Sequence, residues 1–434
     1  MKTRTLKKDK VNVVTLGCSK NLVDSENIIT QLKASDINAV HEDDEQANIV
    51  IVNTCGFIDL AKEESINTIL QYAEVKREGD LDKLYVTGCL SQRYKDDLET
   101  EIPEVDAYFG TMELPGLLEK FNVSYQHELL GERHISTLSH YAYLKISEGC
   151  NRTCTFCAIP LMRGKHVSRS IDDLVLETKN LARQGVKEIM LIAQELTYYG
   201  LDIYKRRALS ELLDKLCEVE GIEWIRLHYA YPSKFPMDII ETMTRQPKIC
   251  NYLDVPLQHA SDSVLERMKR QITRQETREF IESVRRINPD VAIRTTFLVG
   301  FPGETEEEFQ ELCDFVEEMR FERIGVFKYS HEEDTGAHIL EDNVPAEEKQ
   351  ERANRIMEIQ QSISEEKNGL LIGQTLRVLI DKKEGGNFVG RSEYDSPEVD
   401  NEILLDAQTN FVRIGDFVDV TITDATAYDL YGTI

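Results

Sequence analysis

Long stretches of this chain alternate apolar segments of strand length with segments of helical periodicity. In the first part, apolar segments at Val11–Leu16, Asn48–Asn53 and Leu84–Thr87 are separated by helical patterns at Ser25–Ala34 and Ala61–Arg77. Strands joined through helices form parallel sheets with the helices packed on their faces. The sequence therefore predicts an α/β fold that begins with a parallel-sheet domain.

A second alternating region follows, and it contains six strand patterns. Helical patterns separate them, most clearly at Ile171–Gln184, Ser210–Val219, Thr273–Asn288 and Thr305–Met319. The six strands are expected at Tyr141–Ser147, Glu188–Ala193, Trp224–Tyr229, Tyr252–Val255, Val291–Val299 and Arg323–Lys328. A closed barrel of this kind has eight strand–helix units, so six predict a partial (βα)6 barrel with its site at the carboxyl ends of the strands.

The last part of the chain consists of short strand patterns without helices between them. A charged helical pattern at Pro345–Asn368 leads to this part, and Gly385 and Gly386 are a turn signal. The strands are expected at Leu376–Ile380, Phe388–Arg391, Ile403–Asp406, Phe417–Ile422 and Tyr428–Tyr431. Five short strands predict a small barrel of the type that binds oligonucleotides or oligosaccharides. We therefore expect three domains, at residues 1–137, 138–368 and 369–434.

The first strand pattern of the middle region is followed by Cys150, Cys154 and Cys157, with Cys-x3-Cys-x2-Cys spacing. Three thiolates are more than a disulfide uses and one fewer than a closed four-cysteine metal site needs. On a cluster of four irons they leave one iron open to another ligand. The alternatives are a zinc site completed by His166, or buried thiols that are close only by chance. Zinc ligands more often come as paired Cys-x2-Cys units, and the sequence has no second pair.

A second set of cysteines lies in the first domain, where Cys18, Cys55 and Cys89 each come just past the end of a strand pattern. The carboxyl ends of parallel strands meet at one edge of the sheet, where ligand sites are usually found. We therefore expect these cysteines to lie together and to hold a second cluster, the alternative being three separate core residues. A glycine, which lets the backbone approach closely, is next to each of them: Gly17, Gly56 and Gly88.

The Cys150–Cys157 loop resembles the signature of radical S-adenosylmethionine (SAM) enzymes, whose open iron binds the amino and carboxylate groups of SAM. Polar residues that follow other strands of the middle region are candidates for contacts to SAM. The candidate cofactor-binding residues are Phe156, Gln194, Glu195, Gln258, Arg294 and Gly300. The alternative for the residues at strand ends is a turn or a helix cap, and His259 is expected to be a hydrogen-bonded structural histidine. We assign no chemistry to the remaining cysteines, Cys217, Cys250 and Cys313.

Several motifs together resemble the methylthiotransferase family of radical SAM enzymes, and the resemblance covers nearly the whole chain. The motifs are LGCSKNLVDSE (16–26), VNTCGFI (52–58), VTGCLSQRY (86–94), ISEGCNRTCTFCAIP (146–160), DVPLQHASDSVL (254–265) and TTFLVGFPGET (295–305). The resemblance implies two 4Fe-4S clusters, one that binds SAM at Cys150, Cys154 and Cys157 and an auxiliary one at the first-domain cysteines. It also implies that the last barrel is a TRAM domain.

Within this family, GCSKNLVDSE and GRSEYDSPEVDNEIL (390–404) are most similar to the enzymes that modify a small-subunit ribosomal protein. The chain departs from that pattern at Asn401, where glycine is expected, and at Glu195, where aspartate is more usual. The resemblance implies transfer of a methylthio group to the β-carbon of an aspartate. One SAM is the source of the methyl group, and a second is cleaved to a radical that removes hydrogen from the substrate carbon. A reductant such as flavodoxin or ferredoxin is implied as the electron donor.

The charge of the chain bears on its partner. The sequence has 51 Lys and Arg against 78 Asp and Glu, a net charge of −27, and the stretch from Glu366 to Ile434 has 6 basic and 13 acidic residues. RNA binding requires Lys and Arg that displace counterions. The charge therefore favours a basic protein substrate over the main alternative, a methylthiotransferase acting on N6-isopentenyl- or threonylcarbamoyl-adenosine in tRNA. Alternatives outside the family are an iron–sulfur electron-transfer protein and a zinc-stabilised RNA-binding protein.

The sequence also indicates a compartment. No apolar run approaches the roughly 20 residues that a membrane span needs. The basic start, Met1–Lys10, is not followed by the apolar core of a signal peptide. Nine cysteines without an export signal indicate the reducing cytoplasm, where clusters are more common than disulfides.

Overall fold

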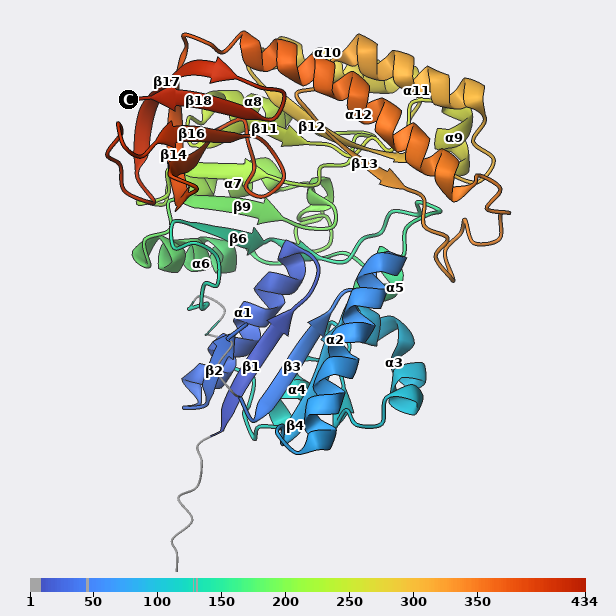
Figure 1. Ribbon diagram of the computed structural model, residues 1–434, viewed down its shortest axis with the longest axis vertical. Coiled ribbons are helices and arrows are strands. Elements are labelled where there is room, and N and C mark those ends of the chain that lie inside the picture. Colours follow the sequence, from blue (N-terminus) through green and yellow to red (C-terminus); the bar gives the residue numbers. More distant parts are fainter. Residues whose placement is uncertain (1–8, 44–46, 128, 130–131) are drawn as a thin grey trace, which may run out of the picture. The chain divides into compact units, whose positions relative to one another are not determined.

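The computed structural model describes residues 9–43, 47–127, 129 and 132–434 (Figure 1). The basic segment at the start of the chain lies almost wholly outside the described residues. The chain forms two compact units. The first comprises residues 1–137, 143–151 and 158–181, and the second comprises residues 138–142, 152–157 and 182–434. The final β-barrel thus shares one unit with most of the middle region.

The first unit contains the predicted parallel sheet. Its strands are β1 (Lys10–Thr15), β2 (Asn38–His41), β3 (Ile49–Thr54), β4 (Lys83–Gly88) and β5 (Ala107–Tyr108), in the order β2-β1-β3-β4-β5. Every neighbouring pair is parallel. The strand order changes direction between β1 and β3, which is the point in such sheets where ligands usually bind.

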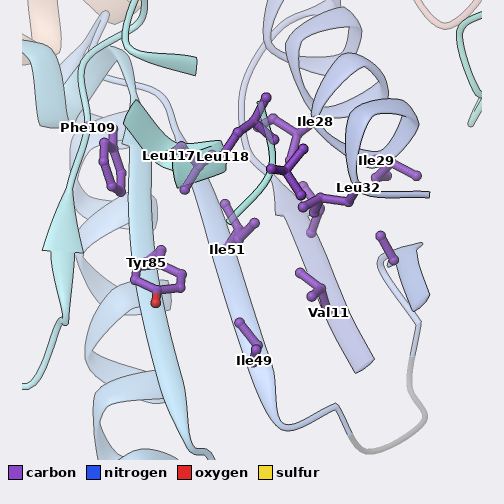
Figure 2. Packing of buried hydrophobic residues seen from close by; sticks show 13 residues of the cluster. Val11, Ile28, Ile29, Leu32, Ile49, Ile51, Tyr85, Phe109, Leu117 and Leu118 are labelled. Atoms are coloured by element: carbon purple, nitrogen blue, oxygen red, sulfur yellow. The ribbon is translucent and has the colours of Figure 1, made fainter. Parts of the chain in front are cut away.

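Both faces of this sheet are covered by helices, which is why all six residues of β3 are buried. Because side chains alternate along a strand, Ile49 and Ile51 face α1 and α4 (Figure 2). Val50 and Val52 face α2 and α3 on the other side of the sheet. The helices are α1 (Ser19–Ala34), α2 (Asp59–Glu78), α3 (Cys89–Glu101) and α4 (Leu114–Glu119). The two apolar clusters fix the strands, and with them the ends of the strands.

The middle region forms an open six-stranded sheet in the order β13-β12-β11-β10-β9-β6, which confirms the predicted partial barrel. Its strands are β6 (Tyr141–Lys145), β9 (Glu188–Ile192), β10 (Trp224–Leu227), β11 (Ile249–Asp254), β12 (Ala292–Val299) and β13 (Arg323–Lys328). Its helices are α6 (Ile171–Arg183), α7 (Leu209–Cys217), α8 (Asp238–Arg245), α9 (Asp262–Arg267), α10 (Arg274–Ile287) and α11 (Glu306–Met319). Capping boxes, Thr273 with Glu276 and Thr305 with Glu308, begin α10 and α11.

The last five strands close into the predicted small barrel, in the order β14-β15-β16-β18-β17. They are β14 (Thr375–Glu384), β15 (Asn387–Ser392), β16 (Glu402–Asp406), β17 (Phe417–Ala425) and β18 (Asp429–Thr433). Gly385 and Gly386 form the turn between β14 and β15 with φ of 56° and 88°, conformations that glycine adopts without strain. The long helix α12 (Ala346–Gly369) precedes the barrel, and its Ser364 and Asn368 side chains donate to the Ala427 carbonyl.

Buried ion pairs join the small barrel to the open sheet. Glu188 of β9 accepts from Arg226 Nε at 2.8 Å and from Arg391 Nη2 of the small barrel at 2.7 Å, and all three residues are buried. Burial alone raises the pKa of a carboxyl group, but the two guanidinium groups hold the pKa of Glu188 below its ordinary value. Two domains predicted from the sequence thus pack through paired charges. Among the described helices, none has the length and apolar character needed to cross a membrane.

Candidate cluster-binding sites

The three cysteines of the first domain follow three neighbouring strands. Cys18 is the residue before α1 and lies three positions after β1, Cys55 directly follows β3, and Cys89 directly follows β4. The Cys18 side chain is exposed, whereas the Cys55 and Cys89 side chains are buried. The side of the three-cysteine group at Cys18 is therefore open to solvent, and the side at Cys55 and Cys89 is buried.

Close packing of the loops brings these cysteines together. A Cβ atom on Gly17 would lie 2.7 Å from Cys55 Cβ and 2.9 Å from Cys55 Sγ, and a Cβ on Gly88 would lie 2.5 Å from the Thr54 carbonyl oxygen. Gly17 and Gly88 also have φ of 93° and 101°, where other residues are strained. Glycine is therefore required here because each loop meets its neighbour.

The surroundings of the buried thiols determine their protonation. Burial raises the pKa of Cys55, and it raises the pKa of Cys89 to about 12, while the nearby Arg163 guanidinium partly offsets the effect at Cys89. The negative charge of a Cys18 thiolate raises the pKa of both thiols further. Such thiols lose their protons when a metal binds them.

The three cysteines suit a cluster better than a single metal ion. Among the described residues, no three His, Cys, Asp or Glu side chains surround one point closely enough to hold a single metal ion. In an iron–sulfur cluster each cysteine binds a different iron, so the sulfurs surround a larger group. Three thiols at neighbouring strand ends, two buried and one exposed, fit that requirement.

The loop of Cys150 is tied down within the first unit. Its backbone N–H donates to the Gly164 carbonyl at 3.1 Å, and the strands β7 (Ser147–Glu148) and β8 (Val167–Ser168) pair on either side. A Cβ on Gly149 would lie 2.2 Å from the Lys165 carbonyl oxygen, so the loop closes only with glycine at this position. His166, the candidate fourth zinc ligand, has Nε2 3.0 Å from the Ser168 hydroxyl.

Cys154 and Cys157 belong to the second unit and are half-buried. The Cys157 N–H donates to the Cys154 carbonyl at 3.2 Å. The Arg270 guanidinium donates to Cys154 Sγ at 3.4 Å, and the Tyr231 hydroxyl lies 3.9 Å from the same sulfur. A cation thus faces one thiol of this set, a contact that no local pattern in the sequence indicates.

The candidates for SAM contacts lie in different surroundings. Glu195 caps the short 3-10 helix η2 (Leu196–Tyr198), and it also pairs at 3.1 Å with Arg152, which stacks between the rings of Tyr198 and Tyr231. The cap expected as the alternative for Glu195 is therefore present. Phe156 packs against the apolar side chains around Phe301. Gln194 is the second residue after β9.

Gln258, Arg294 and Gly300 are held in place by neighbouring residues. Gln258 has φ of 78°, which is unusual for a residue with a side chain, and its carbonyl accepts from the Leu298 N–H. The Arg294 side chain lies 3.6 Å from Asp254 and 3.2 Å from Asp400. Gly300 has φ of 72°, and a Cβ there would meet Lys349 Cγ at 2.2 Å.

His259 and the three cysteines outside the two sets lie among residues of the protein core or at helix ends. The Ser261 N–H donates to His259 Nδ1 at 3.0 Å, and His259 Nε2 is 3.6 Å from Glu304, as expected for a structural histidine. Cys250 and Cys313 are buried in the core, and Cys217 is half-buried at the end of α7.

Three family models match the chain. They are the uncharacterized protein family UPF0004 over residues 10–110, the radical SAM superfamily over residues 144–316 and the TRAM domain over residues 372–434. The matched ranges correspond in order to the parallel sheet, the open sheet and the small barrel.

Similar proteins cover the whole length of the chain. The ribosomal protein uS12 methylthiotransferase RimO of Christiangramia forsetii is 61% identical over 432 residues, which are 100% of this chain and 96% of the relative. Proteins of the same name from Flavobacterium psychrophilum and Bacteroides thetaiotaomicron are 61% and 48% identical. Both alignments cover 99% or more of each chain.

Solved structures show the same fold at low identity. The radical SAM methyltransferase TsrM from Kitasatospora setae superposes with a TM-score of 0.53 at 13% identity, over 74% of this chain and 75% of that one. The cobalamin-dependent SAM radical enzyme OxsB gives a TM-score of 0.52, also at 13% identity, over 81% of this chain and 56% of that one. At such identity the likeness concerns the fold.

A test of the first-domain site uses the glycine before Cys89. Gly88→Ala places a Cβ against the Thr54 carbonyl in a backbone conformation that costs about 1–3 kcal/mol for other residues, and it displaces Cys89. We expect the reconstituted protein to lose about half of its iron. The matched control is Gly79→Ala in the same unit, where φ is also positive at 88° but no atom lies within 4 Å of the new Cβ.

The control is expected to lose about 1–2 kcal/mol of unfolding free energy and to keep all of its iron. Iron content and chemical denaturation are measured for both variants. Equal iron in the two variants would show that the approach of the β3 and β4 ends does not position a ligand.

Proposed function

The chain belongs to the family of ribosomal protein uS12 methylthiotransferases named RimO, and from this we propose that it adds a methylthio group to the β-carbon of an aspartate in uS12. The observation that carries the proposal is the high identity to these relatives across the full length of the chain. The two sets of three cysteines support it, since sulfur insertion uses one cluster for SAM and another for sulfur.

Enzymes of this family use SAM and two 4Fe-4S clusters. We assign the SAM cluster to Cys150, Cys154 and Cys157, and the auxiliary cluster to Cys18, Cys55 and Cys89. When bound, these groups supply the electron for SAM cleavage and a site for the transferred sulfur. The chain holds them through thiolates at the ends of strands, and its tightly packed glycine loops fix where the sulfurs lie. The exposed Cys18 marks the open side of the auxiliary site.

We assign the contacts to SAM to Phe156, Gln194, Glu195, Gln258, Arg294 and Gly300. The left-handed backbone of Gln258 supports its assignment best, because strained conformations are concentrated at ligand sites. The Glu195 side chain is held beside the cysteine loop by its pair with Arg152, a residue of that loop. Arg294 has weaker support, since two carboxylates of the chain already lie beside its guanidinium.

The acidic final barrel is the surface that we assign to the basic substrate protein. Glu398, Asp406, Asp419 and Asp424 are exposed there. Opposite charge speeds the encounter of two proteins, whereas acidic side chains repel the phosphates of RNA. We also propose flavodoxin or ferredoxin as the reductant, a cytoplasmic location, and functional domains at residues 1–137, 138–368 and 369–434.

The function is tested with the reconstituted full chain, SAM, a chemical reductant and purified uS12. Mass spectrometry is expected to detect a methylthio group on one aspartate of uS12, and chromatography to detect 5′-deoxyadenosine. Cys18/Cys55/Cys89→Ala should still cleave SAM but transfer no methylthio group, because only the auxiliary site is lost. Cys150/Cys154/Cys157→Ala should do neither. An unmodified uS12 with a modified tRNA would contradict the proposal in favour of the RNA substrate.

The role of charge is tested by replacing Glu398, Asp406, Asp419 and Asp424 with lysine. We expect kcat/KM for uS12 to fall at least about tenfold at low salt, and the difference to shrink as salt screens the charges. The matched control makes four equal changes on the outer helices α10 and α11, at Glu279, Glu282, Glu311 and Glu317, which are also exposed. An equal fall in both variants would mean that total charge, and not the barrel surface, attracts the substrate.

A further inference from the structure

Arg163 is a buried cation beside the auxiliary site. It is the last residue of the short helix α5 (Ile159–Arg163), which begins two residues after Cys157. Its side chain is 3% exposed. The guanidinium lies close enough to Cys89 to offset part of the rise that burial causes in the pKa of its thiol. Its Nη1 donates to Asp24 at 2.6 Å and to Glu148 at 3.3 Å. The same residue thus lies beside a cysteine of one set and contacts the strand that leads to Cys150 of the other.

The position of this guanidinium is fixed from two sides. Cys89 packs with Ala158 and Met162 of the α5 segment, and the Thr111 hydroxyl donates to the Met162 carbonyl at 2.7 Å. Arg163 Nη2 also donates to Asn21 Oδ1. The guanidinium therefore has little freedom to turn away from Cys89.

Asn21 is itself bonded to the loops that carry the other two cysteines. Its Nδ2 donates to the Leu16 carbonyl at 2.8 Å and to the Thr54 carbonyl at 3.0 Å. Leu16 lies two residues before Cys18, and Thr54 directly precedes Cys55. The Cys89 thiol donates to Asn21 Oδ1 at 3.7 Å, so Asn21 links Arg163 to all three segments of the auxiliary site.

The charges around Arg163 are closely balanced. Lys145 Nζ pairs with Glu148 at 2.6 Å and with Asp24, so two cations and two carboxylates form one group. Because these charges cancel within the chain, loss of Arg163 leaves a net negative charge beside Cys89. Loss of one of the carboxylates has the opposite effect.

We propose that Arg163 is a positioning residue that holds the Cys89 sulfur and raises the reduction potential of the auxiliary cluster. The inference rests on the assignment of that cluster to Cys18, Cys55 and Cys89. A cluster with thiolate ligands becomes more negative when it accepts one electron from a reductant. A fixed cation close to it therefore stabilises the reduced form more than the oxidised form.

The test is a redox titration of the reconstituted full chain, followed by electron paramagnetic resonance. The signal of the auxiliary cluster is identified in the full chain with Cys150/Cys154/Cys157→Ala. Arg163→Gln is expected to lower its midpoint potential, and Arg163→Lys, which keeps the charge, to restore most of the difference. Asp24→Asn is expected to raise the potential, because it removes a negative charge from the same group.

The matched control is Arg133→Gln. Arg133 is a fully buried arginine of the same unit and pairs with Glu26 and Glu177 at 2.9 and 2.8 Å. Its replacement should destabilise the unit and leave the midpoint potential unchanged. A shift of the same size in this control would show that the effect comes from general loosening, and would overturn the inference.

Two further results would also overturn it. One is an unchanged potential in Arg163→Gln, and the other is a shift of the same sign in Arg163→Gln and Asp24→Asn. If Arg163→Gln does not take up iron, the Asp24→Asn variant decides, since a raised potential supports the inference and an unchanged one contradicts it. The cluster assignment fails separately, if Cys18/Cys55/Cys89→Ala keeps all of its iron.

Discussion

The parallel pairing of β1, β3 and β4 is the constraint on which the auxiliary site depends. The carboxyl ends of parallel strands lie at one edge of the sheet, and the chain after each strand turns there to begin a helix. The chain places a cysteine at each of these three turns and glycine where the turns touch one another. Residues separated by more than 30 positions thereby share one site. Burial makes the Cys55 and Cys89 thiols poor acids until a metal binds, so metal binding and loop order are coupled.

The second unit uses buried charge to join its parts. Arg226 and Arg391 reach Glu188 from different strands, one in the open sheet and one in the small barrel. Tyr252 and Arg294 of the open sheet likewise bond Asp400 of the final domain. Buried pairs of this kind add directional contacts, and removing one partner would leave the other as an unpaired buried charge. The final barrel is therefore attached in a defined orientation while its acidic outer residues stay exposed.

Features that depend on the residue pattern within a short stretch of sequence could be predicted. Strand β3 was recognised because its apolar run is continuous, whereas the short strands β2 and β5 and the helix α3, which begins at Cys89 itself, were not. That Cys18, Cys55 and Cys89 lie near one another could be predicted because the strands before them are parallel and end at one edge of the sheet.

The arginines that surround the thiols were not predicted. Arg163 and Asp24 are 139 residues apart, and no local pattern indicates that they pair. For the same reason the contact of Arg270 with Cys154 was not foreseen, and neither were the two carboxylates beside Arg294. Such contacts depend on how distant segments pack, which periodicity does not encode.

The central claim is that the two cysteine sets hold two separate clusters. It is tested most directly by iron and acid-labile sulfide after anaerobic reconstitution of the native chain and of the two triple-alanine variants. We expect about eight irons in the native chain and about four in each variant, because each cluster contains four. Four irons in the native chain, lost only with Cys150, Cys154 and Cys157, would contradict it. Zinc in place of iron would contradict both assignments.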